Sequence, residues 1–537
     1  EEKEEKDKDS EDGEDGEDGD EKEDGDKKEN DKESEGCEVE DCLVIPDDVS
    51  AADAVNVTGD EAADEGEGDA KEKKRQTGLF QHKLNLFEGG DKKHHTYRIP
   101  SIVSTGGDRL IAFAEGRKKW SKDYGDIDLV YKLSDDGGAT WTSMRYISGT
   151  NDGTFDTWGN PTVLYERPWD GASKGRIHVY MMYNEGDLKQ KGHKPLHHGD
   201  RLVFHVYSDN WGKSWSVRRN RTDALQPETF KWDATGPGTG IQKQLAPNRS
   251  MLVVPAIKRN FISTDHGLSW TSVPITTSDP PPLSSEATVS ECADGSLFRN
   301  DRPIGSNRAR QTLYLARPDR PSDKPVTLAE ELPDPRCEGS SLTWKPGKLI
   351  FLNSASERFR TKLRLYASAD CGKTWQVKRW LYKHLYPEKH DRPVARGGYT
   401  SMAKLEDGRV AVLLETDIVD KSHSKHGHRS IDFLTFDLDW LCEGAAFCFG
   451  KSCEVEALAD DDHHFRVAKS CVEEALGNGS PPDTVDVQLR RDGELLDSGP
   501  VAMQSADHGF YKGQWAAKKS PAVFKKGDVL LFPERDG

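Results

Sequence analysis

The stretch Ser134-Asp-Asp-Gly-Gly-Ala-Thr-Trp141 decides the fold of this chain, because three later stretches repeat its pattern. The shared pattern is Ser-x-Asp-x-Gly-x-Ser/Thr-Trp, and only the second copy replaces the Asp, with Asn210. An Asp or Asn side chain bonds its own backbone in a turn, and Gly accepts a positive φ. Each copy therefore predicts a hairpin turn whose Trp opens the next strand as a core anchor. The later copies are Ser208-Asp-Asn-Trp-Gly-Lys-Ser-Trp215, Ser263-Thr-Asp-His-Gly-Leu-Ser-Trp270 and Ser368-Ala-Asp-Cys-Gly-Lys-Thr-Trp375.

The spacing of the copies predicts the architecture. They start 74, 55 and 105 residues apart. This pattern is the Asp-box of β-propellers, in which one four-stranded blade takes roughly 40–60 residues. From Leu79 to Trp440 the chain reads as short alternating strands separated by turn signals. We expect an all-β fold, with a β-propeller over residues 79–440 in which some blades lack the motif.

The N-terminal part has a different composition. Residues 1–35 hold 21 acidic residues and 7 lysines, which accounts for 14 of the chain's 20 net negative charges. Almost no apolar residue occurs before Val39, so this part cannot bury enough surface to offset its ordering entropy. We expect residues 1–78 to be a disordered acidic tail and linker. A calcium-binding tail is the sharper alternative, but the Asp spacing does not make an EF-hand loop.

The C-terminal part, residues 441–537, is expected to be a small Cys-containing, β-rich region. It contains alternating segments such as Val485-Asp-Val-Gln-Leu. Four of the nine cysteines crowd near its start, as in a disulfide-clipped junction. Zinc is the alternative for this cluster, although the close CxxC pairs of zinc sites are missing. The four are Cys442, Cys448, Cys453 and Cys471.

The cysteines and four glycosylation sequons favour a secreted or extracellular protein, while a lysosomal or cytoplasmic location stays open. No apolar run approaches 18 residues, so the sequence predicts no transmembrane helix. The sequons begin at Asn56, Asn220, Asn248 and Asn478.

A segment ahead of the first Asp-box, Thr96-Tyr97-Arg98-Ile99-Pro100, points to a function. Its proline restricts the backbone and places the Arg98 guanidinium at a strand start. Arg-Ile-Pro upstream of several Asp-boxes resembles the sialidase superfamily, and the resemblance covers roughly residues 79–440. It implies a six-bladed β-propeller with a sialic acid site at its central end.

Sialidases hold the substrate carboxylate with three arginines, because planar guanidinium forks suit a carboxylate better than lysine does. The resemblance implies Arg98, Arg302 and Arg360 for these positions. Arg302 follows the Glu-containing segment that begins at Glu286, and Arg360 precedes the last Asp-box. The alternatives left open are Arg299 for the second position and Arg358 or Arg364 for the third.

The nucleophile that the resemblance implies is Tyr399, in Arg396-Gly-Gly-Tyr399-Thr. A neutral phenol avoids the repulsion that a carboxylate nucleophile would meet from the substrate's own carboxylate. A phenol with a pKa of about 10 also needs a base, and the resemblance places Glu286 to take its proton. Sialidases with a tyrosine nucleophile are an exception to the two-carboxylate rule of glycosidases.

The acid/base that the resemblance implies is Asp123, which follows Arg98 by 25 residues and precedes Ile127-Asp128. Asp126 is the alternative. Protonating a leaving-group oxygen needs a raised carboxyl pKa, which a loop closing over the ligand supplies through desolvation.

Two further residues complete the implied site. Glu415 ends an apolar strand, where an unpaired carboxylate is costly to bury, and the resemblance makes Arg98 its partner. Arg117 is also expected in the pocket. Trp120 and Trp158 either line the pocket or pack. The His-rich segments 189–198 and 423–428 are interpreted as solvated loops, and we expect neither a metal nor a cofactor.

Together these residues predict a retaining exo-α-sialidase, a glycoside hydrolase acting on sialylated glycoproteins, glycolipids or oligosaccharides, with no nucleic acid partner. A trans-sialidase and a hydrolase preferring a deaminated sialic acid share the same residues and remain alternatives. A non-catalytic lectin is disfavoured because Tyr399, Glu286 and an Asp candidate are all present. A purely structural propeller leaves the joint presence of these residues unexplained. Linkage preference and oligomeric state are open.

Overall fold

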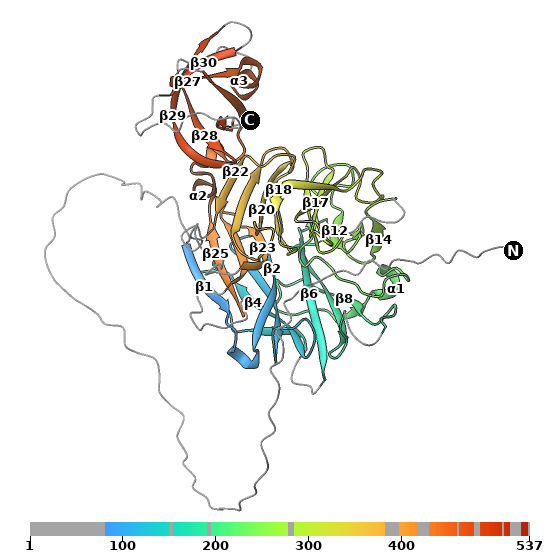
Figure 1. Cartoon of the computed structure of the whole chain (residues 1–537). Coiled ribbons are helices and arrows are strands. Elements are labelled where there is room, and N and C mark those ends of the chain that lie inside the picture. Colours follow the sequence, from blue (N-terminus) through green and yellow to red (C-terminus); the bar gives the residue numbers. More distant parts are fainter. Residues whose placement is uncertain are drawn as a thin grey trace, which may run out of the picture. The chain divides into compact units, whose positions relative to one another are not determined.

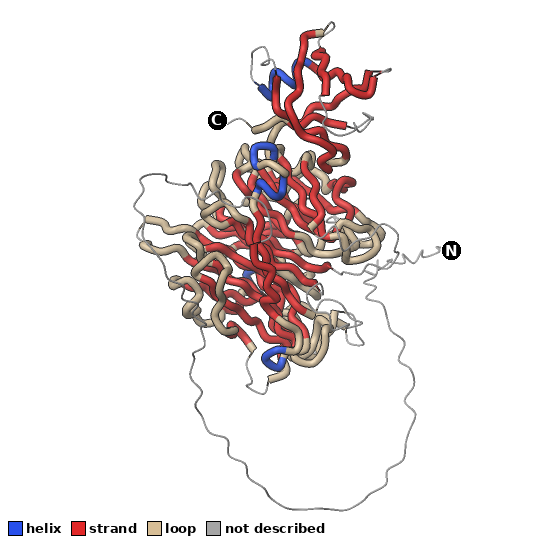
Figure 2. The backbone as a smooth tube through the Cα atoms, turned by 90° about the vertical axis from the view of Figure 1, so that its left-hand side faces the viewer, coloured by secondary structure: helices blue, strands red, loops and turns tan. Residues whose placement is uncertain are grey.

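A computed structural model describes the chain from residue 81 onward. Strands make up most of the described residues, and the helices are short (Figure 2). The longest, α3 (Lys469–Leu476), has eight residues, and no described helix is long and apolar enough to cross a membrane. The acidic tail expected over residues 1–78 lies outside the described part. The described ranges are 81–149, 154–170, 172–190, 195–277, 284–381, 397–416, 429–458, 461–476, 484–506, 510–515 and 528–534.

The largest sheet has nine strands and comprises two antiparallel meanders. A parallel pairing of Ile127 with Thr157 joins them. The first meander consists of β2 (Thr96–Ser104), β3 (Leu110–Arg117), β4 (Ile127–Ser134) and β5 (Arg145–Ser148). The second consists of β6 (Asp156–Glu166), β7 (Arg176–Glu185), β8 (Leu202–Ser208) and β9 (Arg219–Asn220), with β10 (Gly238–Thr239) beside β6.

Three antiparallel sheets of four consecutive strands follow along the chain. The first contains β11 (Ile241–Gln242), β12 (Leu252–Ala256), β13 (Arg259–Ser263) and β14 (Thr271–Pro274). The second contains β15 (Ala287–Glu291), β16 (Leu297–Asp301), β17 (Ala309–Leu315) and β18 (Thr327–Pro333). The third contains β19 (Ser340–Lys345), β20 (Lys348–Ser354), β21 (Leu363–Ser368) and β22 (Val377–Trp380).

A further four-stranded sheet joins the first and last strands of residues 81–436. It combines β23 (Gly397–Lys404), β24 (Val410–Thr416) and β25 (Ser430–Phe436) with β1 (Gln81–Phe87). Figure 1 shows β1 (blue) and β25 (orange) side by side, although they lie far apart in the sequence. The first described strand therefore completes the sheet that the later strands leave open, and the sheets form a propeller-like arrangement.

The hydrophobic core is divided among the interfaces between successive sheets. In β12, Leu252 and Val254 pack with Phe261 on one side, whereas Val253 packs with Leu297 on the other. Successive side chains of a strand point to opposite faces, so a strand buried on both faces needs apolar residues at every position. This explains uninterrupted runs such as Leu252-Val-Val-Pro-Ala256.

The Asp-boxes form the turns between the third and fourth strands of four meanders. In the first copy, the Asp136 carboxylate accepts hydrogen bonds from the Ser134 hydroxyl and the Thr140 backbone at 2.8 Å each. The Gly138 amide, with a φ of 91°, donates to the Ser134 hydroxyl. The other copies repeat these bonds. The turns that the sequence pattern predicts are therefore present.

The second Asp-box, with Asn210 in place of Asp, keeps the turn although one side-chain hydrogen bond runs in the opposite direction. The Asn210 amide donates to the Ser214 hydroxyl at 2.7 Å, whereas in the first copy the Thr140 hydroxyl donates to Asp136 at 2.6 Å. Since the Asn210 carbonyl still accepts from the Ser214 backbone, the amide preserves the loop without a charge.

The C-terminal region contains a closed barrel of six strands around its own apolar cluster. Two short helices, α2 (Leu438–Cys442) and η3 (Ala445–Phe447), precede it. The four clustered cysteines form the disulfides Cys442–Cys448 and Cys453–Cys471. The disulfide interpretation is therefore confirmed, and the zinc alternative is wrong. The strands are β26 (Ser452–Leu458), β27 (Asp461–Ala468), β30 (Phe510–Trp515), β29 (Glu494–Ser505), β28 (Thr484–Arg491) and β31 (Asp528–Leu531).

Candidate active site

The eight residues predicted for the site come from the ends of inner strands of several sheets, and the structure brings them together. Arg98 lies in β2, Tyr399 in β23 and Glu415 in β24. Arg117 is the last residue of β3, and the others lie beside strand ends or in connecting loops: Asp123, Glu286, Arg302 and Arg360. Chain segments more than 300 residues apart therefore supply one pocket.

The centre of the site is the phenol of Tyr399, whose side chain is buried. Its hydroxyl donates to Glu286 Oε1 at 2.5 Å and accepts from Arg302 Nη1 at 2.8 Å. Arg302 Nη1 also lies 2.8 Å from Glu286 Oε2, which closes a triangle. The phenol thus has a carboxylate as proton acceptor and a guanidinium that stabilises negative charge on its oxygen.

Burial, reinforced by the negative charge of Glu286, raises the pKa of Tyr399 well above its ordinary value, although Arg302 and Arg360 oppose the shift. The hydroxyl is therefore protonated in the resting site. An attack by its oxygen requires simultaneous transfer of the proton, and Glu286 lies at the distance of a short hydrogen bond for it.

Glu415 positions both Arg98 and the strand that carries Tyr399. Its two carboxylate oxygens accept from Arg98 Nε and Nη2 at 3.2 and 3.3 Å, a forked pair. The same oxygens accept from the backbone amides of Ile99 and Tyr399 at 2.8 and 3.2 Å. Four donors satisfy a carboxylate whose exposed fraction is 0%, which offsets the cost of burying it.

A bulge in β2 orients Arg98. The pairing of β2 with β3 shifts register between Arg98 and Ser101, and Ile99 has a φ of 57°. A β-branched residue at positive φ is strained, and the hydrogen bond from its amide to Glu415 holds it there. The Arg98 guanidinium consequently lies over the Tyr399 ring, 5.3 Å from its centroid.

Asp123 contacts two arginines of the site. Its Oδ1 lies 2.7 Å from Arg117 Nη1 and 3.2 Å from Arg98 Nη1. Desolvation raises its pKa, but the charges of Arg117 and then Arg98 outweigh it and hold the pKa of Asp123 well below its usual range. Its alternative, Asp126, instead pairs with Lys118 at 2.8 Å.

The third arginine of the sequence prediction, Arg360, lies 5.5 Å from the centroid of the Tyr399 ring. Its backbone carbonyl accepts from the Gly397 amide at 2.6 Å, which ties its loop to the strand of Tyr399. The alternatives contact other groups: Arg299 bonds Asp301, Arg364 pairs with Glu494, and Arg358 lies against Phe359.

Of the two tryptophans left open, Trp158 packs against Tyr183 and Phe204 inside the nine-stranded sheet. Trp120 is half-buried and donates its indole N–H to the Tyr124 carbonyl, within the loop that carries Asp123. The segment 189–198 is described only in part, and the segment 423–428 lies outside the described residues.

The sequence analysis missed two buried polar residues beside the site. Arg201 bonds Asn160 at 2.6 Å and lies over the Trp232 ring, and burial lowers its pKa to about 10 against the nearby charges of Glu115 and Asp233. Glu338 accepts from the amide of Thr400, the residue after Tyr399, at 2.8 Å. No motif marks either residue, because each reaches the pocket only through the fold.

Known proteins resemble this chain over much of its length. The sequence pattern of a family described as a BNR repeat-like domain matches residues 108–412. An exo-alpha-sialidase from Arthroderma benhamiae is 33% identical over 379 residues, covering 65% of this chain and 85% of that protein. An exo-alpha-sialidase from Aspergillus fumigatus is 32% identical, covering 65% and 86%.

Solved structures share the fold. A Hadza microbial sialidase, Hz136, aligns with a TM-score of 0.54 at 23% identity over 66% of this chain and 68% of its own. A Trypanosoma rangeli sialidase aligns with a TM-score of 0.51 at 15% identity over 85% of this chain and 96% of its own.

Proposed function

The chain is an enzyme of the sialidase family, and we propose that it is a retaining exo-α-sialidase that removes terminal sialic acids from glycoconjugates. The observation that carries the proposal is the contact of the Tyr399 hydroxyl with both Glu286 and Arg302. A buried phenol with a carboxylate acceptor and guanidinium groups around it suits nucleophilic attack beside an anionic group better than a carboxylate nucleophile does.

We infer that the propeller has six blades. Two observations support this count: the nine-stranded sheet contains two meanders, and an apolar cluster lies between them as it does between the other neighbouring sheets. Six such clusters lie between the neighbouring sheets, and one of them also includes residues from Trp440 onward. Each of the two meanders then counts as one blade.

In this mechanism Arg98, Arg302 and Arg360 bind the substrate carboxylate. All three lie around the Tyr399 ring or hydroxyl, so a carboxylate bound among them brings the adjacent anomeric carbon to the nucleophile. Planar guanidinium groups supply directional, charge-assisted bonds for this purpose. Terminal sialosides of glycoproteins, glycolipids and oligosaccharides are the substrates that this arrangement fits.

In the first step the Tyr399 oxygen forms a bond to the anomeric carbon while its proton passes to Glu286. The glycosidic C–O bond breaks, and Asp123 gives its proton to the departing oxygen. In the second step Asp123 takes a proton from water, the water oxygen displaces the tyrosine, and Glu286 returns the proton to the phenolate. Two displacements retain the anomeric configuration.

Asp123 must be protonated for the first step, although Arg117 and Arg98 lower its pKa in the free protein. Substrate binding supplies the change. A substrate carboxylate competes with Asp123 for Arg98, and the bound sugar covers a side chain that is 65% exposed without it. Loss of a cationic partner and loss of water both raise a carboxyl pKa.

The assembled nucleophile, base and acid candidates favour catalysis over the lectin alternative. Hydrolysis rather than transfer, and the preferred sialic acid, stay predictions. A secreted or extracellular location also stays a prediction, and the three disulfides support an oxidising compartment.

The test is Tyr399→Phe, assayed by release of an aryl aglycone from an α-sialoside. We expect steady turnover to fall more than about 100-fold, roughly 2.7 kcal/mol, with little change in Tm. Tyr180→Phe is the matched control, since that buried hydroxyl has no hydrogen-bond partner among the described residues. Near-normal turnover by the Tyr399 variant removes the nucleophile assignment, and wild-type binding without turnover favours the lectin.

A further inference from the structure

The loop of residues 118–126, here called the acid loop, carries Asp123 and connects β3 to β4. Its base is narrow: the Lys118 amide donates to the Asp126 carbonyl at 3.1 Å, just beyond the paired residues Arg117 and Ile127. Inside the loop the Trp120 indole N–H donates to the Tyr124 carbonyl at 2.8 Å. The position of Asp123 therefore depends on how this base is held.

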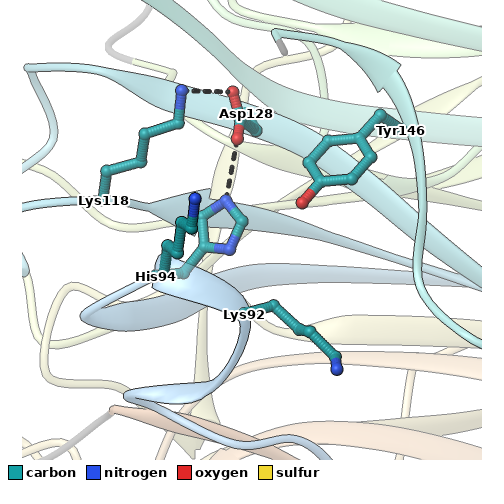
Figure 3. A pocket seen from close by; sticks show the side chains of 6 residues that line it. Lys92, His94, Lys118, Asp128 and Tyr146 are labelled. Atoms are coloured by element: carbon teal, nitrogen blue, oxygen red, sulfur yellow. Dashed lines mark hydrogen bonds and ion pairs between the residues drawn. The ribbon is translucent and has the colours of Figure 1, made fainter. Parts of the chain in front are cut away.

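Arg117, the last residue of β3, and Lys118, the first residue of the acid loop, hold the loop from opposite sides. The Arg117 guanidinium reaches into the active site, where it bonds the Ser121 carbonyl and pairs with Asp123. The Lys118 side chain lies in a separate pocket beside Asp128, His94 and Tyr146 (Figure 3). Successive residues of an extended chain point to opposite faces. Arg117 therefore points into the active site, and Lys118 points into the pocket beside Asp128.

In that second pocket the Lys118 ammonium bridges two carboxylates. It lies 2.8 Å from Asp126 Oδ1, at the end of the acid loop, and 3.2 Å from Asp128 Oδ1, at the start of β4. The interaction is partly shielded, because only 18% of the Lys118 side chain is exposed. Without the ammonium, the two carboxylates would repel each other across the base of the loop.

The far end of this bridge is rigid. Asp128 Oδ2 lies 2.8 Å from His94 Nε2, and His94 Nδ1 lies 3.1 Å from the buried Tyr97 hydroxyl. His94 and Asp128 are themselves buried. A Cβ atom placed on Gly116 would lie 2.6 Å from the His94 ring, so the histidine has no room to move toward β3.

We propose that Lys118 is a positioning residue for the reaction, which holds the acid loop so that Asp123 meets the leaving-group oxygen. The inference rests on the proposed function, because it takes Asp123 as the acid. Lys118 pairs with Asp126 and Asp128 rather than with Asp123, so its influence passes through the base of the loop. A general acid contributes about 10²–10⁴-fold, and a misplacement of about 1 Å loses much of such a gain.

The test compares kcat/KM for an alkyl α-sialoside, whose leaving group needs a proton, with kcat/KM for an aryl α-sialoside, whose phenolate leaves unaided. For Lys118→Met we expect a loss of about 10-fold or more with the alkyl substrate and less than about 3-fold with the aryl one. The KM for the aryl substrate should stay near the wild-type value. Lys92→Met, which lines the same pocket, should leave both values unchanged.

Lys118→Gln keeps a hydrogen-bond donor without the charge, and it provides a milder variant should the methionine variant fold poorly. Lys118→Arg, which keeps the charge, should restore most of the alkyl activity. Equal losses with both substrates in the folded methionine or glutamine variant would mean a general structural role and overturn the inference.

Asp123→Ala separates this inference from the proposed function. Where Asp123→Ala shows the selective alkyl defect and the Lys118 variants do not, the acid assignment stands and the positioning role is wrong. Where Asp123→Ala shows no selective defect, the acid assignment fails and the positioning role falls with it.

Discussion

At the scale of single residues, the three glutamates near Tyr399 have different surroundings. Glu286 and Glu415 each face a guanidinium. Glu338 lies among the same residues, but its Oε1 has no hydrogen-bond partner in the described part of the chain. Burial, assisted by the charges of Glu286 and Glu415, raises the pKa of Glu338 well above its ordinary value. A raised pKa favours the uncharged form of Glu338.

Glu338→Gln is expected to stabilise the protein at neutral pH. An acid with a raised folded-state pKa holds its proton in the folded chain and loses it in the unfolded chain, so stability falls as pH rises above the unfolded value of about 4.3. Glutamine removes this penalty. We expect a Tm gain of about 1–3 °C near pH 7.5 that shrinks toward zero near pH 4.

Glu415→Gln is the contrasting variant for that measurement. It leaves the Arg98 guanidinium without its forked carboxylate, so Tm should fall at neutral pH. A Glu338→Gln gain that does not depend on pH would show that Glu338 is ionised in the folded protein.

At the scale of elements, the Asp-boxes and the site occupy different ends of the meanders. Each box joins a third strand to a fourth, whereas Arg98 and Tyr399 lie in the first strands of their meanders, β2 and β23. One box is also a covalent junction, because Cys371 of the last copy bonds Cys292 between β15 and β16. This disulfide ties two neighbouring sheets together.

Removing the disulfide Cys292–Cys371 should cost more stability than removing Cys442–Cys448. The first closes a loop with a sequence separation of 79 residues and the second one of 6. Loop-closure entropy predicts about 4.5 kcal/mol for the longer loop and about 2 kcal/mol for the shorter. Paired Cys→Ala variants compared by thermal unfolding measure the difference. Equal losses would show that local packing, rather than the constraint on the unfolded chain, sets the contribution.

At the scale of the whole molecule, charge and catalysis are separated along the chain. Residues 1–35 carry 14 of the 20 net negative charges, whereas every residue of the site lies between Arg98 and Glu415. The C-terminal barrel has its own apolar cluster, and Glu494 of β29 bonds Arg364 and the Trp380 indole. All residues of the candidate site therefore lie within the sheets and loops of residues 81–436, on which the C-terminal region packs.

Deleting residues 1–75 should leave both the kcat/KM for an aryl sialoside and the Tm within error of the full chain. A highly acidic segment with few apolar residues contributes little to a hydrophobic core. The two proteins are compared by activity and calorimetry at two salt concentrations, because any charge effect on an anionic substrate weakens with salt. A Tm loss of several degrees would show that the segment stabilises the propeller.

The sequence by itself determined the turns, the propeller-like class and the set of site candidates. An Asp-box is a local device: its Asp, Gly and Ser bond one another within five residues, so the pattern is legible without the rest of the chain. The candidate residues came from family resemblance, and their catalytic roles stay predictions. The disulfide partner of Cys292 and the choice between zinc and disulfides were beyond the sequence.

Only the tertiary structure decided which aspartate contacts the arginines. Asp123 and Asp126 lie three residues apart on one loop, yet one reaches Arg98 and the other Lys118. It also revealed the bond of Glu338 to the backbone beside Tyr399. The physical reason is that the site forms where the ends of several strands converge, and closure of the sheets by β1 and β25 sets that convergence. A short segment of sequence does not show which side chains will lie together in a buried, low-dielectric space once distant strands are paired.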